Sequence, residues 1–237
     1  MRIAALSDFH IGPHGYTDEF HHTEARFLEF LATLEATHDR IVLVGDIWQT
    51  EHDLLPGRRG AARQLARARR RVPALAERLA GPKYTYVHGN HDAVARHELG
   101  AAEQVRVEAD GFAAVFIHGH QFDPVFRRAY TAARAATWLM GRTRRAGLRP
   151  LAQWIEGRDI AIKHSKFGHA EGPYAEAARG LLREHAADVV VMGHTHVPHL
   201  HELPEGRVVN TGSCSRARLM YVSIDTATRA VEVVRER

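Results

Sequence analysis

The chain of 237 residues has little of what would place it outside the ordinary globular proteins. It contains one cysteine, Cys214, so an intramolecular disulfide framework is impossible and a reducing compartment suits it. No apolar run approaches the roughly 18 residues that a membrane span requires. The first residues lead directly into an expected strand, without the pattern of a signal peptide. We therefore expect a cytoplasmic protein, with peripheral contact at the inner face of the membrane left open.

Charge is unevenly distributed, although the formal net charge is only +4. Residues 57–71 contain seven arginines and no acidic residue. Residues 125–170 contain eight arginines and two lysines against Glu156 and Asp159. Such segments indicate an anionic ligand or an anionic surface, such as nucleic acid or a membrane. A solvated arginine-rich helix face is the plainer alternative for each segment.

Five groups of polar side chains recur along the chain, each directly after a short apolar stretch of the kind that forms a β-strand. The stretches are 3–6, 41–44, 84–87, 113–117 and 189–192. Side chains that follow parallel strands converge at one edge of a sheet, and the groups therefore predict one metal site. The groups are Asp8-Phe-His10, Gly45-Asp46, Gly89-Asn90-His91-Asp92, His118-Gly-His120 and Gly193-His194-Thr-His196.

Hydrophobic periodicity indicates an α/β chain. Helical patterns cover 23–36, 61–80, 125–141, 148–157 and 173–186, with Thr23 as the first N-cap and a break at Gly141. Strand patterns cover 2–6, 40–44, 83–88, 104–108, 112–117 and 188–192, and then 199–202, 207–210, 218–224 and 229–235. We predict one domain, 1–237, built as a two-sheet sandwich with helices on its outer faces.

The helical segment at about 121–187 is expected to form a cap over the metal edge. Its apolar residues either pack the cap helices together or hold an apolar substrate. They are Trp138, Leu139, Met140, Leu148, Leu151, Trp154, Ile155 and Ile160.

The ligand types suit a pair of divalent ions. Hydrolysis of a phosphoester needs neutralised phosphoryl oxygens and a hydroxide at neutral pH, which two cations roughly 3.5–4 Å apart supply. We expect Asp46 to bridge them, because a carboxylate can face both ions. Asp8 and His10 share a face on a regular strand and can reach one ion together. Mixed His, Asp and Asn ligands favour Mn²⁺, Fe or Zn²⁺ over Ca²⁺, and Mn²⁺ is our first expectation.

Other polar residues have less certain places in this site. His91 is expected beside the phosphate, where it can protonate the leaving oxygen or hold a phosphoryl oxygen, and Asp92 can orient its imidazole. His120 and Asp123 can either assist or belong to loop structure. Histidines without such a context are expected at the surface, and these are His14, His21, His22, His38, His52, His97, His185, His199 and His201.

Taken together, these five groups resemble the motif set of the calcineurin-like metallophosphoesterase family across residues 8–196. The resemblance implies a four-layered αββα sandwich with a dinuclear centre, and His91 as the acid or phosphate-positioning histidine. It implies that one metal is held by Asp8, His10, Asp46 and His196. The other metal is then held by Asp46, Asn90, His118 and His194.

Within that superfamily, the layout is similar to the UDP-2,3-diacylglucosamine pyrophosphatase branch. The resemblance rests on Gly45-Asp46-Ile-Trp48, the helical insertion and Ser165-Lys166. It implies cleavage of a pyrophosphate, with acyl chains held under the helical cap. The chain departs from that branch at His91, where arginine is usual, and at His120, where aspartate is usual. Our candidates for phosphate or diphosphate contact are Arg127, Arg128, Lys163 and Lys166.

We therefore expect a dinuclear-metal-dependent phosphohydrolase that cleaves a phosphoester or pyrophosphate bond by a metal-activated hydroxide. Its partner would be an anionic phosphorylated substrate, linked to a nucleotide or a lipid. The alternative is a Mn-dependent phosphodiesterase or nuclease whose basic segments follow a phosphate backbone. Few aromatic residues interleave those arginines, although base stacking would favour them. A third hypothesis is a non-enzymatic binding module at an anionic membrane surface.

Overall fold

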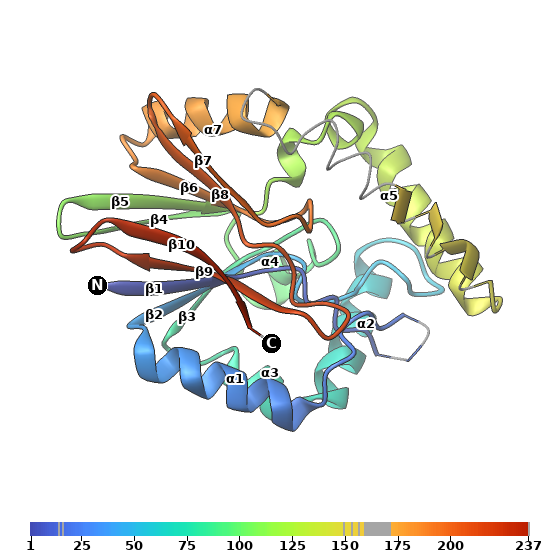
Figure 1. The fold of residues 1–237 in the computed structure, drawn as a ribbon. Helices are drawn as coiled ribbons and strands as arrows, with labels where there is room; N and C mark the ends of the chain where they lie inside the picture. The colour runs from blue at the N-terminus through green and yellow to red at the C-terminus, as the bar shows by residue number, and fades with distance from the viewer. Residues whose placement is uncertain are drawn as a thin grey trace.

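The computed structural model describes residues 1–13, 15, 17–148, 150–152, 154–155, 157–158 and 172–236. Two five-stranded sheets pack face to face, and helices cover both outer faces (Figure 1). This is the four-layered αββα arrangement predicted from the sequence. Of the residues proposed for phosphate contact, Lys163 and Lys166 lie outside the described residues, as does Ser165.

The first sheet has the strand order β10-β9-β1-β2-β3. Its strands β1, β2 and β3 are parallel. Strand β9 is antiparallel to β1, and β10 at the edge is antiparallel to β9. The carboxyl ends of β1, β2 and β3 therefore meet at one edge. The bounds are β1 Arg2–Leu6, β2 Arg40–Val44, β3 Tyr84–Val87, β9 Leu219–Asp225 and β10 Ala230–Glu236.

The second sheet has the order β4-β5-β6-β8-β7. Here β5, β6 and β8 are parallel, and β4 and β7 are antiparallel edge strands. The strand predictions are confirmed with small shifts at their ends. The bounds are β4 Gln104–Ala109, β5 Phe112–Ile117, β6 Val189–Met192, β7 His199–Leu203 and β8 Gly206–Asn210.

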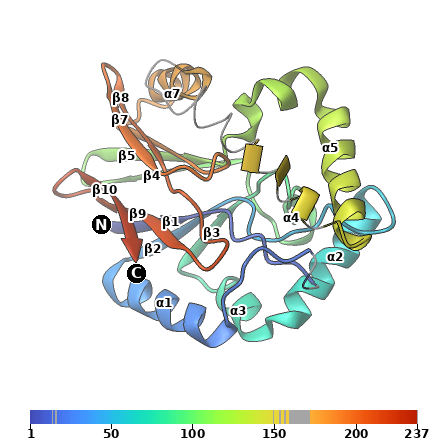
Figure 2. The same cartoon turned by 45° about the vertical axis from the view of Figure 1, so that its right-hand side comes forward.

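Alternation along the strands builds the layers, because successive side chains point to opposite faces of a sheet. In β1, Ile3 and Ala5 join the core between the sheets, while Ala4 and Leu6 join the core under the helices. Helices α1 (Glu24–Thr37), α2 (Arg58–Arg71) and α3 (Pro73–Arg78) cover the first sheet, and α7 (Pro173–Glu184) covers the second (Figures 1 and 2). Thr23 caps α1 as predicted, accepting the backbone N–H of Arg26.

Two helix predictions are wrong. The expected helix over 61–80 is two helices, because Pro73 disfavours the helical region for Val72, which has φ −129° and ψ 66°. The expected break at Gly141 does not occur, since α5 runs unbroken over Pro124–Arg145. A Cβ at Gly141 would lie 2.7 Å from the His52 ring, so this glycine permits close packing and does not end the helix.

Helix α5 is anchored to the body of the protein by its second half. The indole Nε1 of Trp138 donates to the backbone oxygen of Asp53 at 2.9 Å, in the loop that leads to α2 (Figure 2). The guanidinium of Arg144 is 2% exposed and pairs with Glu19, whose other oxygen accepts Arg216 Nε at 2.9 Å. The buried ion pair between Arg144 and Glu19 therefore anchors helix α5 to the body of the protein.

Burial raises the pKa of Glu19, whereas Arg144 and Arg216 lower it by a larger amount. The pKa of Glu19 therefore lies below its ordinary value of 4.5. A depressed folded-state pKa stabilises the fold above the unfolded pKa, and the stabilisation is lost as pH falls through the folded pKa. We expect Glu19→Gln to lower the free energy of unfolding by about 2 kcal/mol at neutral pH. The loss should shrink below the ordinary pKa of 4.5.

Urea unfolding at a series of pH values measures this difference. Glu232→Gln, a change at an exposed strand position, is the matched control and should stay within about 0.5 kcal/mol of wild type. A Glu19→Gln difference that is the same at neutral and acidic pH would contradict the assigned role of the carboxylate.

Candidate metal centre

The five predicted groups lie just past the carboxyl ends of β1, β2, β3, β5 and β6. Their side chains meet at one end of the sandwich. Asp8 Oδ1 lies 3.1 Å from His196 Nε2, which in turn lies 3.2 Å from His10 Nε2. On the other side, Asp46 Oδ2 lies 3.2 Å from His118 Nε2.

Three overlapping groups of potential metal ligands occur among the described residues. Asp8, His10 and His196 form the first, and His10, Asp46 and His91 form the second. Asp46, His118 and His194 form the third, with ligand atoms in each group lying within 4.8 Å of one another. Asp46 belongs to two groups, so its carboxylate lies between the two halves of the site.

The hydrogen bonding around His118 fits a cation. Its Nδ1 lies 2.7 Å from the Val44 carbonyl oxygen, which can only accept, so Nδ1 carries a proton. In the neutral ring, Nε2 then directs a lone pair at the Asp46 carboxylate. Burial lowers the pKa of His118, but Asp46 raises it to about 9. A positive charge is thus favoured between the two groups, and a divalent ion would supply it.

Asn90 provides a second indication that the residues present fit a metal. Its Oδ1 is buried and has no hydrogen-bond partner among the residues that the structure describes, and the same holds for His118 Nε2. Buried polar atoms in proteins nearly always have a partner. Both atoms belong to the expected shell of the same ion, and a bound metal would satisfy both.

Two other histidines that are expected to bind metal, His10 and His194, are oriented by neighbouring acceptors. His10 Nδ1 donates to Gln49 Oε1 at 3.0 Å, which leaves Nε2 facing His196. His194 Nε2 contacts Asp123 Oδ2 at 3.0 Å. Such outer partners fix the tautomer and angle of a metal-binding imidazole. Asp123, whose role the sequence left open, therefore contacts the site directly.

Gln49 is a residue that the sequence reasoning missed. Its amide Nε2 donates to His91 Nδ1 at 2.9 Å and to His52 Nε2 at 3.1 Å, while its oxygen accepts from His10. Because His91 Nδ1 accepts, the proton of neutral His91 lies on Nε2. The one signal in the sequence was a polar residue three positions after Asp46, next to an apolar Ile-Trp pair.

The expected role of Asp92 in orienting His91 is wrong, because Gln49 occupies that position. The buried Asp92 carboxylate instead accepts backbone N–H groups of Ile47 at 2.7 Å and Gly89 at 2.6 Å, and also the Tyr86 hydroxyl. These bonds join the loop after β2 to the loop after β3. Asp92 therefore holds the framework of the site and does not touch the imidazole.

The site concentrates charge in a buried setting. Burial would raise the pKa of Asp46, but the charge of His118 lowers it well below its ordinary value. Burial likewise opposes ionisation of Asp8, and His196 and His10 lower its pKa. For His91, burial lowers the pKa and the Asp46 carboxylate raises it. Burial has the larger effect, so the pKa of His91 lies well below its ordinary value of 6.5. The two carboxylates are ionised and His91 is neutral at neutral pH.

Most of the expected ligands have left-handed backbone, which is uncommon for residues other than glycine. The φ values are 57° at Asp8, 53° at His10, 55° at Asp46, 67° at His194 and 60° at His196. Such conformations cost free energy and cluster at functional sites. Here the backbone turns sharply as it leaves each of these strands, and the turn brings the next side chain over the sheet edge.

The glycines of the motifs are explained by close packing of these turns. A Cβ at Gly89 would lie 2.1 Å from Asp46 Oδ1, and one at Gly193 would lie 2.8 Å from Asp8 Oδ2. At Gly45, which has φ +85°, a Cβ would meet the His118 ring at 2.4 Å. Each glycine therefore leaves the space that a neighbouring ligand occupies.

A sixth polar segment, which the sequence reasoning did not include, follows β8. Ser213 Oγ donates to the Asp8 carbonyl oxygen at 3.0 Å, and Thr211 Oγ1 lies 2.6 Å from Ser7 Oγ. Asn210 Nδ2 donates to the Gly193 oxygen at 2.6 Å. The available signal was the run Asn210-Thr-Gly-Ser213, which begins at the last residue of the strand pattern 207–210.

Several other predicted residues lie elsewhere. Arg128 is exposed on α5, and the side chain of Arg127 lies outside what the structure describes. His22, His38 and His52 are buried, so their expected surface positions are wrong. His38 Nε2 contacts Ser223 Oγ at 3.0 Å, and His22 Nε2 contacts the backbone oxygens of Cys214 and Arg218, each at 3.1 Å.

The apolar residues of the cap do not form a closed core. Leu139 and Trp154 are each 58% exposed, and Leu148, Leu151 and Ile155 are also exposed. Ile160 lies outside the described residues. None of the helices in the described part of the chain has the length and apolar character to cross a membrane.

Comparison with known proteins shows the family and the fold. A family model for calcineurin-like phosphoesterases matches residues 1–198. Vps29 from Chaetomium thermophilum is 12% identical, over 100% of this chain and 94% of its own, with a TM-score of 0.51. A predicted phosphoesterase from Streptococcus pneumoniae is 15% identical, covering 99% and 97%, with a TM-score of 0.45.

A third similar structure is Vps29 from Entamoeba histolytica, solved in complex with Zn²⁺. It is 16% identical over 100% of this chain and 98% of its own, with a TM-score of 0.43. No curated protein matches the chain.

The close approach at Gly89 generates a testable expectation. In Gly89→Ala the new methyl group must displace the Asp46 carboxylate, so metal affinity should fall by at least about 10-fold, the scale on which disturbed ligand orientation acts. Gly180→Ala is the matched control, because a Cβ there meets nothing within 4 Å on α7. Isothermal titration with Mn²⁺ measures both variants. Equal affinities in Gly89→Ala and wild type would show that Asp46 is not a ligand.

Proposed function

The chain belongs to the calcineurin-like phosphoesterase family, and from that premise we propose that it is a two-metal phosphohydrolase that cleaves a phosphoester or pyrophosphate bond. The observation that carries the proposal is that Asp46 belongs to two groups of potential metal ligands, one with His10 and His91 and the other with His118 and His194. Two ions at such a site would neutralise phosphoryl oxygens and lower the pKa of bound water towards neutrality. Mixed nitrogen and oxygen ligands favour Mn²⁺, with Fe or Zn²⁺ as alternatives.

The proposed shells are those that the family resemblance implies. One ion would be held by the side of the site that includes His196, and the other by the side that includes His118 and the unpaired Asn90 oxygen. The first set is Asp8, His10, Asp46 and His196. The second set is Asp46, Asn90, His118 and His194.

His91 is proposed to act on the phosphoryl group and not on a metal. Its Nδ1 is occupied by the Gln49 amide, so Nε2 carries the proton and can donate it. The lowered pKa of this buried ring keeps it neutral, which suits a hydrogen bond to a phosphoryl or leaving oxygen. As a neutral ring, His91 would hold that oxygen by a hydrogen bond from Nε2, and it would act as the general acid only after Nδ1 has gained a second proton.

The substrate is proposed to be a small phosphorylated metabolite, linked to a nucleotide or a lipid. The exposed Leu139, Leu148 and Trp154 on the cap supply apolar surface for a lipid-linked group or for peripheral membrane contact. This feature keeps the UDP-2,3-diacylglucosamine pyrophosphatase-like substrate among the candidates. Arg127, Arg128, Lys163 and Lys166 remain the proposed contacts of a second phosphate.

A nuclease is less well supported by the basic helix α2. Arg63 and Arg67 lie 2.7 and 3.8 Å from the carboxylate of Asp53, and Arg71 lies 2.7 Å from Asp18. These arginines are at least partly neutralised by the protein's own acids. A phosphate backbone would have to compete with these carboxylates for the arginines. Helix α2 is therefore expected to bind nucleic acid more weakly than its sequence indicated.

The assay that tests the proposal compares initial rates with Mn²⁺ on p-nitrophenyl phosphate, bis-p-nitrophenyl phosphate and a UDP-sugar. Preference for the diester or the UDP-sugar would favour a phosphodiesterase or pyrophosphatase, and preference for the monoester would favour a general phosphatase. Binding to anionic vesicles without turnover of any of the three would favour the binding module and contradict a hydrolase.

Replacing the bridging carboxylate should separate metal binding from folding. In Asp46→Asn we expect bound Mn²⁺ to fall from two ions per chain to one or none, and turnover to fall by at least about 10³-fold, since metal activation of water is lost. The thermal unfolding profile should show a folded protein. Metal analysis and initial rates measure the effect, and wild-type turnover in Asp46→Asn would overturn the assignment.

His91→Ala tests the role of the imidazole. We expect both ions to remain bound while turnover falls by roughly 10²–10⁴-fold, the range for a positioned acid. His97→Ala is the matched control, because His97 is an exposed histidine on α4 (Ala95–Glu98) and its loss should leave turnover unchanged. Loss of an ion from His91→Ala would instead make His91 a metal ligand.

A further inference from the structure

His52 is a buried histidine that lies against the cap helix α5 and is connected to the metal centre by one side chain. Its ring is 5% exposed, and its Nε2 lies 3.1 Å from the amide Nε2 of Gln49. The same amide nitrogen lies 2.9 Å from His91 Nδ1. A single amide group therefore joins His52, in the loop after β2, to His91, in the loop after β3.

The directions of these hydrogen bonds are fixed from the side of the metal centre. His10 Nε2 lies 3.2 Å from His196 Nε2, so a metal-binding His10 carries its proton on Nδ1. The Gln49 atom that lies 3.0 Å from this Nδ1 must then be the amide oxygen, because only the oxygen can accept. The two N–H groups of Gln49 are left to donate, one to His91 Nδ1 and one to His52 Nε2.

The His52 ring is held in the form that accepts from Gln49. An accepting Nε2 carries a lone pair, which places the proton of the neutral ring on Nδ1. His52 Nδ1 is buried and has no hydrogen-bond partner among the residues that the structure describes, whereas buried polar atoms nearly always have one. The ring thus satisfies Gln49 and leaves its other nitrogen unpaired there. Burial and the charge of Arg144 lower the pKa of His52 to about 3, so the ring is neutral at neutral pH.

Helix α5 holds the His52 ring in this position. A Cβ added at Gly141 would lie 2.7 Å from the ring atoms Cγ and Cδ2, so the helix backbone rests directly on the ring. Before Gly141, Trp138 Nε1 donates to the backbone oxygen of Asp53 at 2.9 Å. After it, Arg142 Nη2 donates to the backbone oxygen of the next residue at 3.2 Å. The segment that begins at His52 is therefore fixed against α5 (Figure 2).

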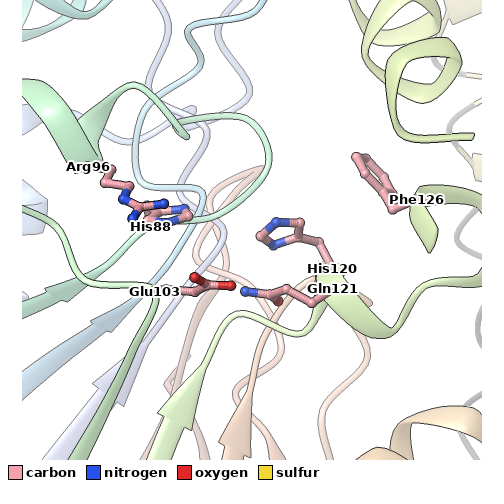
Figure 3. A pocket seen from close by; sticks show the side chains of 6 residues that line it. All are labelled: His88, Arg96, Glu103, His120, Gln121 and Phe126. Atoms are coloured by element: carbon pink, nitrogen blue, oxygen red, sulfur yellow. The ribbon is translucent and has the colours of Figure 1, made fainter.

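His52 does not line the pocket that adjoins the metal centre. This pocket has a volume of about 250 Å³ and lies beside the short helix η1 (His120–Phe122), where the His120 ring centroid is 5.4 Å from that of His118 (Figure 3). Its lining side chains are His88, Arg96, Glu103, His120, Gln121 and Phe126. Neither His52 nor Gln49 is among them, so a change at His52 acts on the centre through Gln49 and not through this pocket.

We propose that His52 is a positioning residue, through which helix α5 fixes the Gln49 amide and, with it, the imidazole of His91. Because His52 accepts one N–H of Gln49, the amide cannot turn, and the other N–H stays directed at His91 Nδ1. The proton of neutral His91 then stays on Nε2. The inference rests on the proposed function, because it concerns the histidine that is proposed to act on the phosphoryl group.

The variants His52→Met and His52→Gln separate the hydrogen bond from the packing. Both new side chains are unbranched and equally long, but only glutamine carries an oxygen that accepts well from the Gln49 amide. On bis-p-nitrophenyl phosphate with saturating Mn²⁺, we expect kcat to fall roughly 10-fold in His52→Met, with KM within about twofold of wild type. His52→Gln should retain kcat within about threefold of wild type. Equal kcat values in the two variants would contradict the proposal.

The tautomer of His91 gives a readout that does not depend on turnover. Long-range proton–nitrogen NMR spectra of the Zn²⁺-loaded protein, with nitrogen-labelled histidine, distinguish a protonated ring nitrogen from a bare one. The spectrum of His91→Ala identifies the His91 signals. We expect one tautomer in wild type, with the proton on Nε2, and a mixture in His52→Met. The same single tautomer in both proteins would overturn the proposal, and this readout decides if His52→Gln does not fold.

Gly141→Ala tests the contribution of helix α5. The added methyl group must displace the His52 ring, so kcat and the His91 tautomer should change in the same direction as in His52→Met. Gly180→Ala on α7 is the matched control and should leave both unchanged, because a Cβ there meets nothing within 4 Å. A wild-type kcat and a single tautomer in Gly141→Ala would contradict the coupling of α5 to His91.

The two readouts distinguish this inference from the proposed function. A His91 tautomer that depends on His52, in a wild-type protein that hydrolyses neither bis-p-nitrophenyl phosphate nor p-nitrophenyl phosphate, would support the positioning role and contradict the hydrolase. Hydrolysis of either ester, with kcat and tautomer both unaffected by His52→Met, would support the hydrolase and contradict the positioning role.

Discussion

The close approach of the loops that follow the strands is the constraint on which the rest of the structure depends. The Asp46 carboxylate occupies the space that a side chain at Gly89 would fill, and its Oδ1 accepts the backbone N–H of His91 at 2.8 Å. Asp92 joins the same two loops through backbone hydrogen bonds. The parallel strands bring the loops to one edge, and the glycines let them approach closely enough for side chains from both sheets to meet.

This packing brings together groups that repel one another unless a proton or a metal cation lies between them. Lone pairs of His118 and Asp46 face each other at 3.2 Å, and two imidazole nitrogens of His10 and His196 lie 3.2 Å apart. Left-handed backbone at five of the ligands adds to the cost of the arrangement. Burial of the surrounding core offsets these costs, and a divalent ion would turn the repulsion into attraction. Stability has thus been exchanged for a site preorganised around positive charge.

The sequence predicted the features that depend on local pattern. Alternation along β1 and the polar residues after each strand were sufficient for the sandwich and for the convergence of Asp8 and Asp46. Contacts between distant segments were not predictable from one sequence. Gln49 orients His10 and His91 only because three loops meet. Gly141 indicates a helix break in the sequence, but in the structure it lies inside a helix because the His52 ring packs against it. The buried pairing of Arg144 with Glu19 likewise joins residues 125 positions apart.

Under the proposed function, two metal ions held on either side of Asp46 make the protein a phosphohydrolase. The most direct test is to strip the protein of metal and to follow p-nitrophenol release from bis-p-nitrophenyl phosphate and p-nitrophenyl phosphate as Mn²⁺ is added back. The account predicts no turnover without metal and a rate that reaches its maximum at two equivalents of Mn²⁺ per chain. Full turnover by the metal-free protein would contradict it.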